Sequence, residues 1–158
     1  MKKLLFTTTI CMSSMFCFAQ SNLVSYEDIK YLLHNNLMRA DTFLTSKGYI
    51  IKSKNDKKKT REYFLATQNG THVDLIVRAD GKRLTMELET NDISQYGTIN
   101  NSVSQYINKQ GSTPDVQSYV MKDVCTIYIQ TQESVPYDPI KKDYVMQIVA
   151  DKNVTYID

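Results

Sequence analysis

The 158-residue chain contains no tryptophan, two histidines, three prolines, five glycines and three cysteines. Two histidines are too few for the His-rich ligand sets that often hold zinc, and neither His34 nor His72 has a serine or cysteine partner in a recognisable nucleophile motif. The few glycines form no phosphate-cradling loop. No linker rich in proline or glycine divides the chain, which favours a single domain.

The first 19 residues have the pattern of a signal peptide. Lys2 and Lys3 precede an apolar run from Leu4 to Phe18, which is too short to span a bilayer comfortably. Small residues precede the expected cleavage site before Gln20. The "FAQ" ending resembles signal peptides of some Gram-negative bacteria, which implies a periplasmic or secreted protein. The alternative is an N-terminal membrane anchor, although no second apolar span follows it.

Removal of this segment would leave one domain, residues 20–158, without net charge. Of the 19 basic residues, Lys2 and Lys3 are lost, and the remaining 17 equal the 17 acidic residues. A neutral chain has no overall field to attract nucleic acid or anionic membranes, so we expect neither as a partner.

Cleavage would also leave Cys125 as the only cysteine, because Cys11 and Cys17 lie in the removed segment. A single cysteine cannot form an intrachain disulfide, even in an oxidising compartment. It lies in the strand-like run "VCTIYIQT", without a basic neighbour that would activate it. We therefore interpret Cys125 as a buried, inert thiol.

Hydrophobic spacing predicts two helices. Ser25 and Asp28 suit the start of a helix, and Gly48 suits its end. Apolar residues between them recur at helical spacing: Ile29, Leu32, Leu33, Leu37, Ala40, Phe43 and Leu44. A similar pattern from Ile93 to Ile107, ended by Gly111, predicts a second helix.

The remaining segments favour strands. Strand-like runs cover residues 49–52, 63–67, 72–90, 118–131 and 142–150. The basic segment 52–62 is interpreted as a solvated hairpin tip, the alternative being a docking site for phosphate or an acidic polymer. This order predicts an α+β fold, an antiparallel sheet with two helices packed on one face.

The two predicted helices have similar endings, "FLTSKG" and "YINKQG", and strands follow each. This similarity indicates a duplicated helix-plus-meander unit. The element order resembles that of PepSY-type and β-lactamase-inhibitor-type domains. Both are secreted binding modules, so the resemblance implies binding rather than catalysis.

The segment "VDLIVRADGKRLTMELET", residues 73–90, reads as a β-hairpin. Asp80-Gly81 suits the centre of a type I′ turn. With this turn, the numbers of two residues that pair across the hairpin add up to 161. The apolar pairs Val77–Leu84, Leu75–Met86 and Val73–Leu88 then share one face.

The opposite face of this predicted hairpin gathers an acidic cluster. His72 would lie opposite Glu89, and Asp74 opposite Glu87. A Ca²⁺ or Mg²⁺ ion could bind such carboxylates. A solvated polar face without a metal is the alternative, and it is our main interpretation.

The order of elements in this part of the chain resembles the plan of PD-(D/E)xK nucleases: a helix, a strand with an aspartate, a strand with a glutamate, and a second helix. Asp74 and Glu87 match the two carboxylates that hold a divalent metal in that family. Position 89 holds glutamate instead of the family's lysine, and Val73 stands where the proline is expected. A third carboxylate would repel an approaching phosphate.

Two functional hypotheses follow. The first is a non-enzymatic exported module, without a cofactor, that binds a protein, peptide or envelope component through its sheet. Eleven tyrosines suit an interface, although packing within the sheet also explains those in the predicted strands: Tyr63, Tyr119, Tyr128 and Tyr144. The second is a metal-dependent hydrolase, or a degenerate nuclease relative, that uses Asp74 and Glu87.

Overall fold

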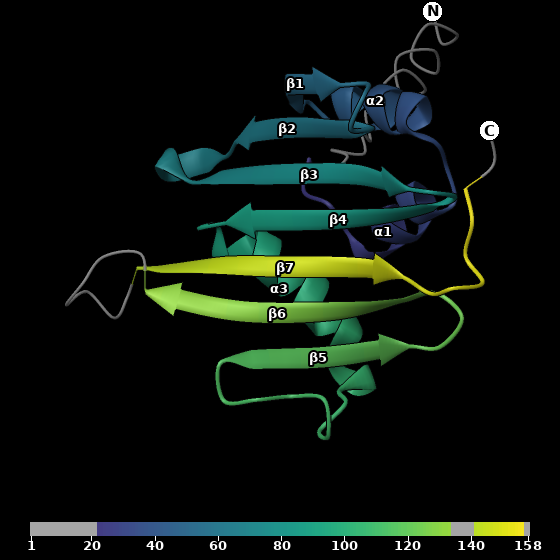
Figure 1. Cartoon of the computed structure of the whole chain (residues 1–158). Coiled ribbons are helices and arrows are strands. Elements are labelled where there is room, and N and C mark those ends of the chain that lie inside the picture. The colour runs from purple at the N-terminus through teal and green to yellow at the C-terminus, as the bar shows by residue number, and fades with distance from the viewer. Residues whose placement is uncertain (1–21, 134–140, 157–158) are drawn as a thin grey trace, which may run out of the picture.

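Seven antiparallel strands form one sheet in the order β1-β2-β3-β4-β7-β6-β5 (Figure 1). This computed structural model describes residues 22–133 and 141–156. The strands are β1 Ile50–Asn55, β2 Thr60–Ala66, β3 His72–Asp80, β4 Arg83–Thr90, β5 Val116–Met121, β6 Cys125–Glu133 and β7 Lys142–Ala150. The helices are α1 Tyr26–Leu33, α2 Leu37–Ser46 and α3 Ile93–Val103, with short 3₁₀ turns at Gln68–Gly70 and Ser104–Tyr106.

The three α-helices pack on one face of this sheet (Figure 1). Helix α2 contacts β1, β2 and β3, whereas α1 and α3 both contact β4. The prediction of an α+β fold with an antiparallel sheet is therefore confirmed. Within the described part of the chain, no helix or strand covers the other face of the sheet. None of the described helices has the length and hydropathy needed to cross a membrane.

The predicted helix over residues 25–48 is wrong in its middle, where it divides into α1 and α2. His34 ends α1, and the side chain of Asn36 starts α2 by accepting a hydrogen bond from the backbone N–H of Arg39 at 3.0 Å. Asparagine side chains bond to nearby backbone groups, so they favour helix ends over helix interiors. The break leaves the apolar side chains on the side of the sheet, and Leu33 and Leu44 are both fully buried.

The predicted register of the β3–β4 hairpin is also wrong. Asp80 pairs with Arg83, so the paired residue numbers total 163 rather than 161. Of the two central turn residues, Gly81 and Lys82, only Gly81 has a positive φ, 61°. This pattern suits a type II′ turn, which needs glycine at its first central position, rather than the type I′ turn that we expected.

This shift changes the partners of each residue but not the faces of the hairpin. Side chains alternate along a strand, so a shift of two keeps every residue on its predicted side. The six predicted inner-face residues are all buried: Val73, Leu75, Val77, Leu84, Met86 and Leu88. Ala79 and Thr90 are buried on the same face. The apolar side chains join Leu33 and Leu44 of the helices in one core.

The sheet consists of two meanders, β1–β4 and β5–β7, which meet where β4 pairs with β7. The predicted strand over residues 118–131 divides into β5 and β6 at a turn in which Asp123 has a positive φ of 60°. Each meander follows helices in the chain, which agrees with a helix-plus-meander unit. The duplication itself remains a prediction. The predicted signal peptide lies outside the described residues.

Candidate functional site

The face of the sheet opposite the helices, here called the outer face, has two chemically different halves. The register places the side chains of each half on that face. The charged half, on β2–β4, contains Thr60, Glu62, Phe64, Ala66, His72, Asp74, Ile76, Arg78, Asp80, Arg83, Thr85, Glu87 and Glu89. The uncharged half, on β5–β7, contains Val116, Ser118, Val120, Thr126, Tyr128, Gln130, Val145, Gln147 and Val149.

The structure brings together three of the four residues of the predicted acidic cluster. Asp74 lies opposite Glu89, and its Oδ2 is 3.6 Å from His72 Nε2. Glu87 lies two pairs further along the hairpin, opposite Ile76 on β3 and Gln147 on β7. The prediction that Asp74 faces Glu87, and that His72 faces Glu89, is therefore wrong.

A lysine that the sequence analysis did not assign to this cluster completes it. Lys52 Nζ donates a hydrogen bond to Asp74 Oδ1 at 2.8 Å, and this bond raises the pKa of the lysine. Lys52 lies 22 positions from Asp74 in the chain and had been assigned to the basic loop. Only the pairing of β1 with β2, and of β2 with β3, shows that the two residues are neighbours.

The contacts of Asp74 show whether this cluster is placed to bind a metal ion. Both oxygens of Asp74 already face a nitrogen, of Lys52 and of His72. In the described ranges, no group of three or more His, Cys, Asp and Glu side chains is placed to hold a metal ion. The contacts of Asp74 are those of a surface ion pair.

The corrected register gives a test in the stability of two variants. Directly opposed like charges cost a few tenths of a kcal/mol, so Glu89→Gln should raise the free energy of unfolding by up to about 0.5 kcal/mol. Glu87→Gln should leave it unchanged, because Glu87 faces Ile76 and Gln147. Urea unfolding of both variants measures the difference. Stabilisation by Glu87→Gln, without stabilisation by Glu89→Gln, would instead support the pairing of Asp74 with Glu87 that was expected from the sequence.

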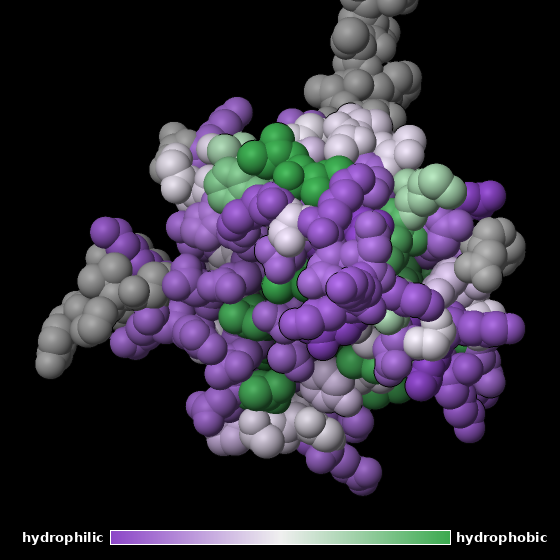
Figure 2. All heavy atoms as spheres, turned by 45° about the horizontal axis from the view of Figure 1, so that its top comes forward, coloured by the Kyte–Doolittle hydropathy of each residue, from purple (hydrophilic) through white to green (hydrophobic). Residues whose placement is uncertain are grey.

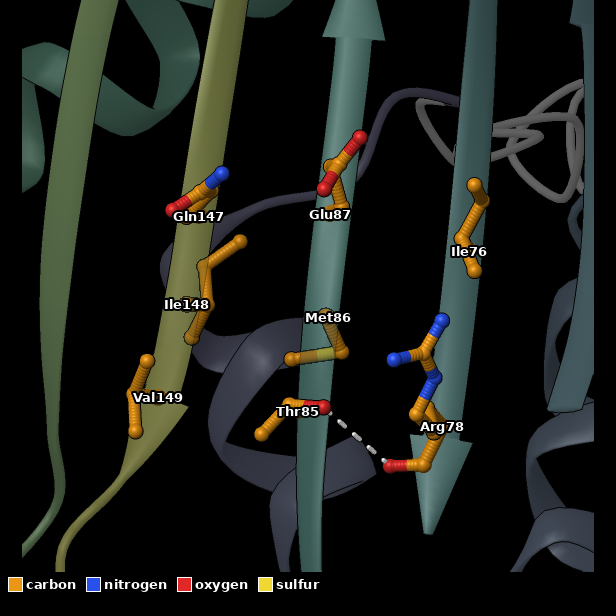
Figure 3. A pocket seen from close by; sticks show the side chains of 8 residues that line it. All are labelled: Ile76, Arg78, Thr85, Met86, Glu87, Gln147, Ile148 and Val149. Carbon is orange, nitrogen blue, oxygen red and sulfur yellow. Dashed lines mark hydrogen bonds between the residues drawn. The ribbon is translucent and has the colours of Figure 1, made fainter. Parts of the chain in front are cut away.

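The outer face is hollowed where β3, β4 and β7 lie side by side (Figure 3). This first depression has a volume of about 360 Å³. It is lined by Ile76, Arg78, Thr85, Met86, Glu87, Gln147, Ile148 and Val149. Arg78 and Glu87 rise from neighbouring strands at its rim, and no ion pair joins them among the described contacts.

A second depression lies beside the first on the uncharged half. It has a volume of about 230 Å³ and is lined by Val116, Tyr128, Gln130, Val145 and Gln147. Gln147 lines both depressions, so the two are adjacent on the outer face. The sequence alone identifies Tyr128 only as one of several strand tyrosines, because alternation does not show which face of a strand is left uncovered.

The two edges of the sheet are less open than its face. At the β5 edge, the backbone N–H of Asn108 donates to Ser118 O at 2.8 Å, and Ser112 Oγ accepts from Ser118 N–H at 3.0 Å. At the β1 edge, the pairing is irregular between Ile51 and Ser53. Bulges and lysines on an edge strand discourage the addition of another strand.

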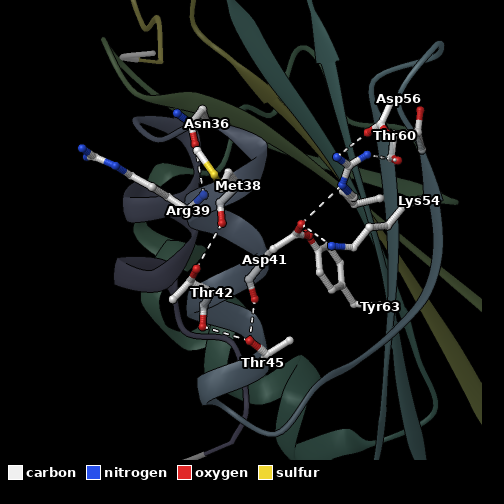
Figure 4. Close-up of polar contacts among 11 residues, drawn as sticks. Asn36, Met38, Arg39, Asp41, Thr42, Thr45, Lys54, Asp56, Thr60 and Tyr63 are labelled. Atoms are coloured by element: carbon white, nitrogen blue, oxygen red, sulfur yellow. Dashed lines mark hydrogen bonds and ion pairs between the residues drawn. The ribbon is translucent and has the colours of Figure 1, made fainter.

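A further group of charged side chains connects α2 to the sheet on the helix side (Figure 4). Asp41 Oδ1 accepts a hydrogen bond from the Tyr63 hydroxyl at 2.7 Å, and Asp41 Oδ2 accepts one from Lys54 Nζ at 2.8 Å. Arg61 Nε lies 3.5 Å from the same carboxylate. Burial alone would raise the pKa of Asp41, but these hydrogen bonds and positive charges outweigh it and hold the pKa below its usual value.

This group stabilises the fold rather than forming a site. Tyr63 is fully buried, and burial together with its bond to Asp41 raises the pKa of its hydroxyl.

Cys125 is also buried, which raises the pKa of its thiol to about 12. A thiol with that pKa stays protonated at neutral pH, as our interpretation of an inert cysteine requires.

Comparison with known proteins gives no match: no protein-family model, curated protein or solved structure matches this chain. The geometry of the outer face therefore carries the functional argument. The resemblances to PepSY-type domains, β-lactamase-inhibitor-type domains and PD-(D/E)xK nucleases remain predictions from element order.

Proposed function

We propose that this chain is a non-enzymatic exported module that binds a component of the cell envelope through the outer face of its sheet. The observation that carries the proposal is the contrast between the two faces. Three helices bury the inner face, whereas the outer face keeps apolar side chains in solvent. Export rests on the signal-peptide pattern of residues 1–19.

Large apolar side chains in solvent support a binding role for the uncharged half. Val149 is 42% exposed, Val120 43% and Tyr128 38%. Exposed apolar residues that gather on one surface commonly mark an interaction site. Seen with the β1 edge tilted forward, hydrophobic side chains form several patches separated by hydrophilic ones (Figure 2).

The alternative, a metal-dependent hydrolase, has no contact in its favour. It requires Asp74 and Glu87 to converge on one ion, and the register places them at different pairs of the hairpin. Lys52 is bonded to Asp74 on the side of the neighbouring strand β2, not beside Glu87. The two depressions of the outer face are also open to solvent, whereas active sites are usually more enclosed.

A labelling experiment tests the proposal. Val149→Cys places a reactive thiol on the outer face, and Met38→Cys places one on α2, where Met38 is 72% exposed. Each variant is coupled to maleimide-polyethylene glycol, and the buried Cys125 keeps the background low. Co-sedimentation with envelope membranes and peptidoglycan from the bacterium that encodes the chain is then measured.

We expect the bulky group at position 149 to abolish co-sedimentation and the same group at position 38 to leave it unchanged. Both unlabelled variants serve as controls for the substitutions themselves. Equal binding by the two labelled proteins, or loss of binding only after labelling at position 38, would contradict the proposal.

A further inference from the structure

The uncharged half of the outer face has an unusual composition for a solvated surface. Its nine residues are four valines, one tyrosine, two glutamines, one threonine and one serine, Ser118, which is buried. Charged side chains occur only around it, with Asp143 at the end of β7 and Arg78 and Glu87 on the neighbouring strands. A ligand that carries a formal charge would find no opposite charge within this half.

Three polar side chains of this half are free to bind a ligand. Tyr128 and Gln147 are paired across β6 and β7, and Gln130 follows two positions along β6. In the parts of the chain that the structure describes, no hydrogen bond engages the side chain of Tyr128, Gln130 or Gln147. One aromatic ring and two amides thus surround the second depression.

The size of the uncharged half argues against a second copy of the chain as its occupant. Three strands about 4.8 Å apart and five residues of about 3.4 Å each give a footprint of roughly 240 Å². A stable protein interface usually buries about 800 Å² on each partner. The uncharged half is therefore too small for a dimer contact by itself, but large enough for two or three sugar rings.

We propose that the uncharged half binds a neutral glycan, an inference that rests on the outer face being the binding surface. A glutamine amide both donates and accepts, which matches a pair of neighbouring hydroxyl groups on a sugar. The ring of Tyr128 offers a flat apolar surface to the C–H face of the same sugar, and its hydroxyl offers another hydrogen bond.

A peptide fits this surface less well than a glycan. A peptide strand usually binds by adding to a sheet edge, where backbone groups pair with it. Here the contacts of Asn108 and Ser112 cover the β5 edge, and a bulge disrupts the β1 edge. The outer face offers only side chains, and their amides and hydroxyl match the hydroxyl groups of a sugar.

A glycan array with neutral and acidic glycans tests this inference, with the fluorescently labelled protein as the probe. We expect neutral glycans to be bound, and Tyr128→Ala and Gln147→Glu each to weaken binding by about tenfold or more. Tyr31→Ala is the matched control, because Tyr31 is 43% exposed on α1 and away from the sheet face. Calorimetry with the best neutral glycan should give a Kd that changes less than about twofold between about 0.05 and 0.5 M salt.

Three outcomes would overturn the inference: binding of acidic glycans alone, binding of neutral glycans equally by Tyr128→Ala, or no binding to any glycan on the array. Its failure is distinguishable from failure of the proposed function. If labelling at position 149 still blocks co-sedimentation while the array is silent, the outer face binds an envelope component of another class, a peptide or protein included.

Discussion

The variant Leu75→Asp is expected to be unfolded, or to fail to accumulate, at neutral pH. Leu75 is 1% exposed and lies on β3 between Tyr63 and Leu88, within the main core. A carboxylate there would have no partner, so its desolvation costs several kcal/mol or forces it to stay protonated. Domains of this size have only about 5–15 kcal/mol of stability in total.

The matched control is Asp74→Leu, one position away on the outer face. Asp74 pairs with Lys52 near the surface, so this variant should fold with a small change in melting temperature. Circular dichroism melts compare the two proteins. Similar melting of both would contradict the assignment of the two sheet faces, and the account of the outer face would fail with it.

Asp41→Ala is expected to lower the free energy of unfolding by about 2–4 kcal/mol, because it removes the acceptor of the buried Tyr63 hydroxyl and the carboxylate nearest to the buried Nε of Arg61. Asp56→Ala is the control: Asp56 also bonds to Arg61, but its side chain is 84% exposed. Its loss should cost under about 1 kcal/mol. Urea unfolding at pH 7 measures both changes. Equal effects would show that burial of the Asp41 contacts contributes little.

The same variant should change the dependence of stability on pH. The pKa of Asp41 is lower in the folded protein than in the unfolded chain, so its contribution is fully present above the unfolded value of about 3.9. That contribution is lost as the pH falls through the folded pKa. Unfolding experiments between about pH 2 and 7 should therefore show a shallower acid loss in Asp41→Ala than in the unchanged protein.

The sequence predicted the faces of the central hairpin better than its pairing. Alternation of apolar residues from Val73 to Leu88 is enough to define a buried side, because only one side of the sheet is covered. The register depends on which two residues occupy the turn, and Asp80-Gly81 and Gly81-Lys82 both suit a glycine-containing turn. Only the φ values separate the two.

Other features depended on contacts between distant parts of the chain. The partner of Asp74 is Lys52, which becomes its neighbour only because β2 lies between their strands. The uncharged half likewise comes from the pairing of β7 with both β4 and β6. The helical spacing of apolar residues continues through Asn35 and Asn36, so the hydrophobic pattern does not show the break between α1 and α2. The break arises because Asn36 caps the start of α2.

The most direct measurement of the central claim is hydroxyl-radical footprinting of the protein, free and bound to envelope material. Tyr128 on the outer face and Tyr31 on α1 are matched in exposure, at 38% and 43%, so their oxidation rates in the free protein should be similar. If the outer face is the binding surface, binding should strongly slow the oxidation of Tyr128 and leave the oxidation rates of Tyr31 and Met38 unchanged. Protection of Tyr31 or Met38 without protection of Tyr128 would show that the helices, not the sheet, meet the partner.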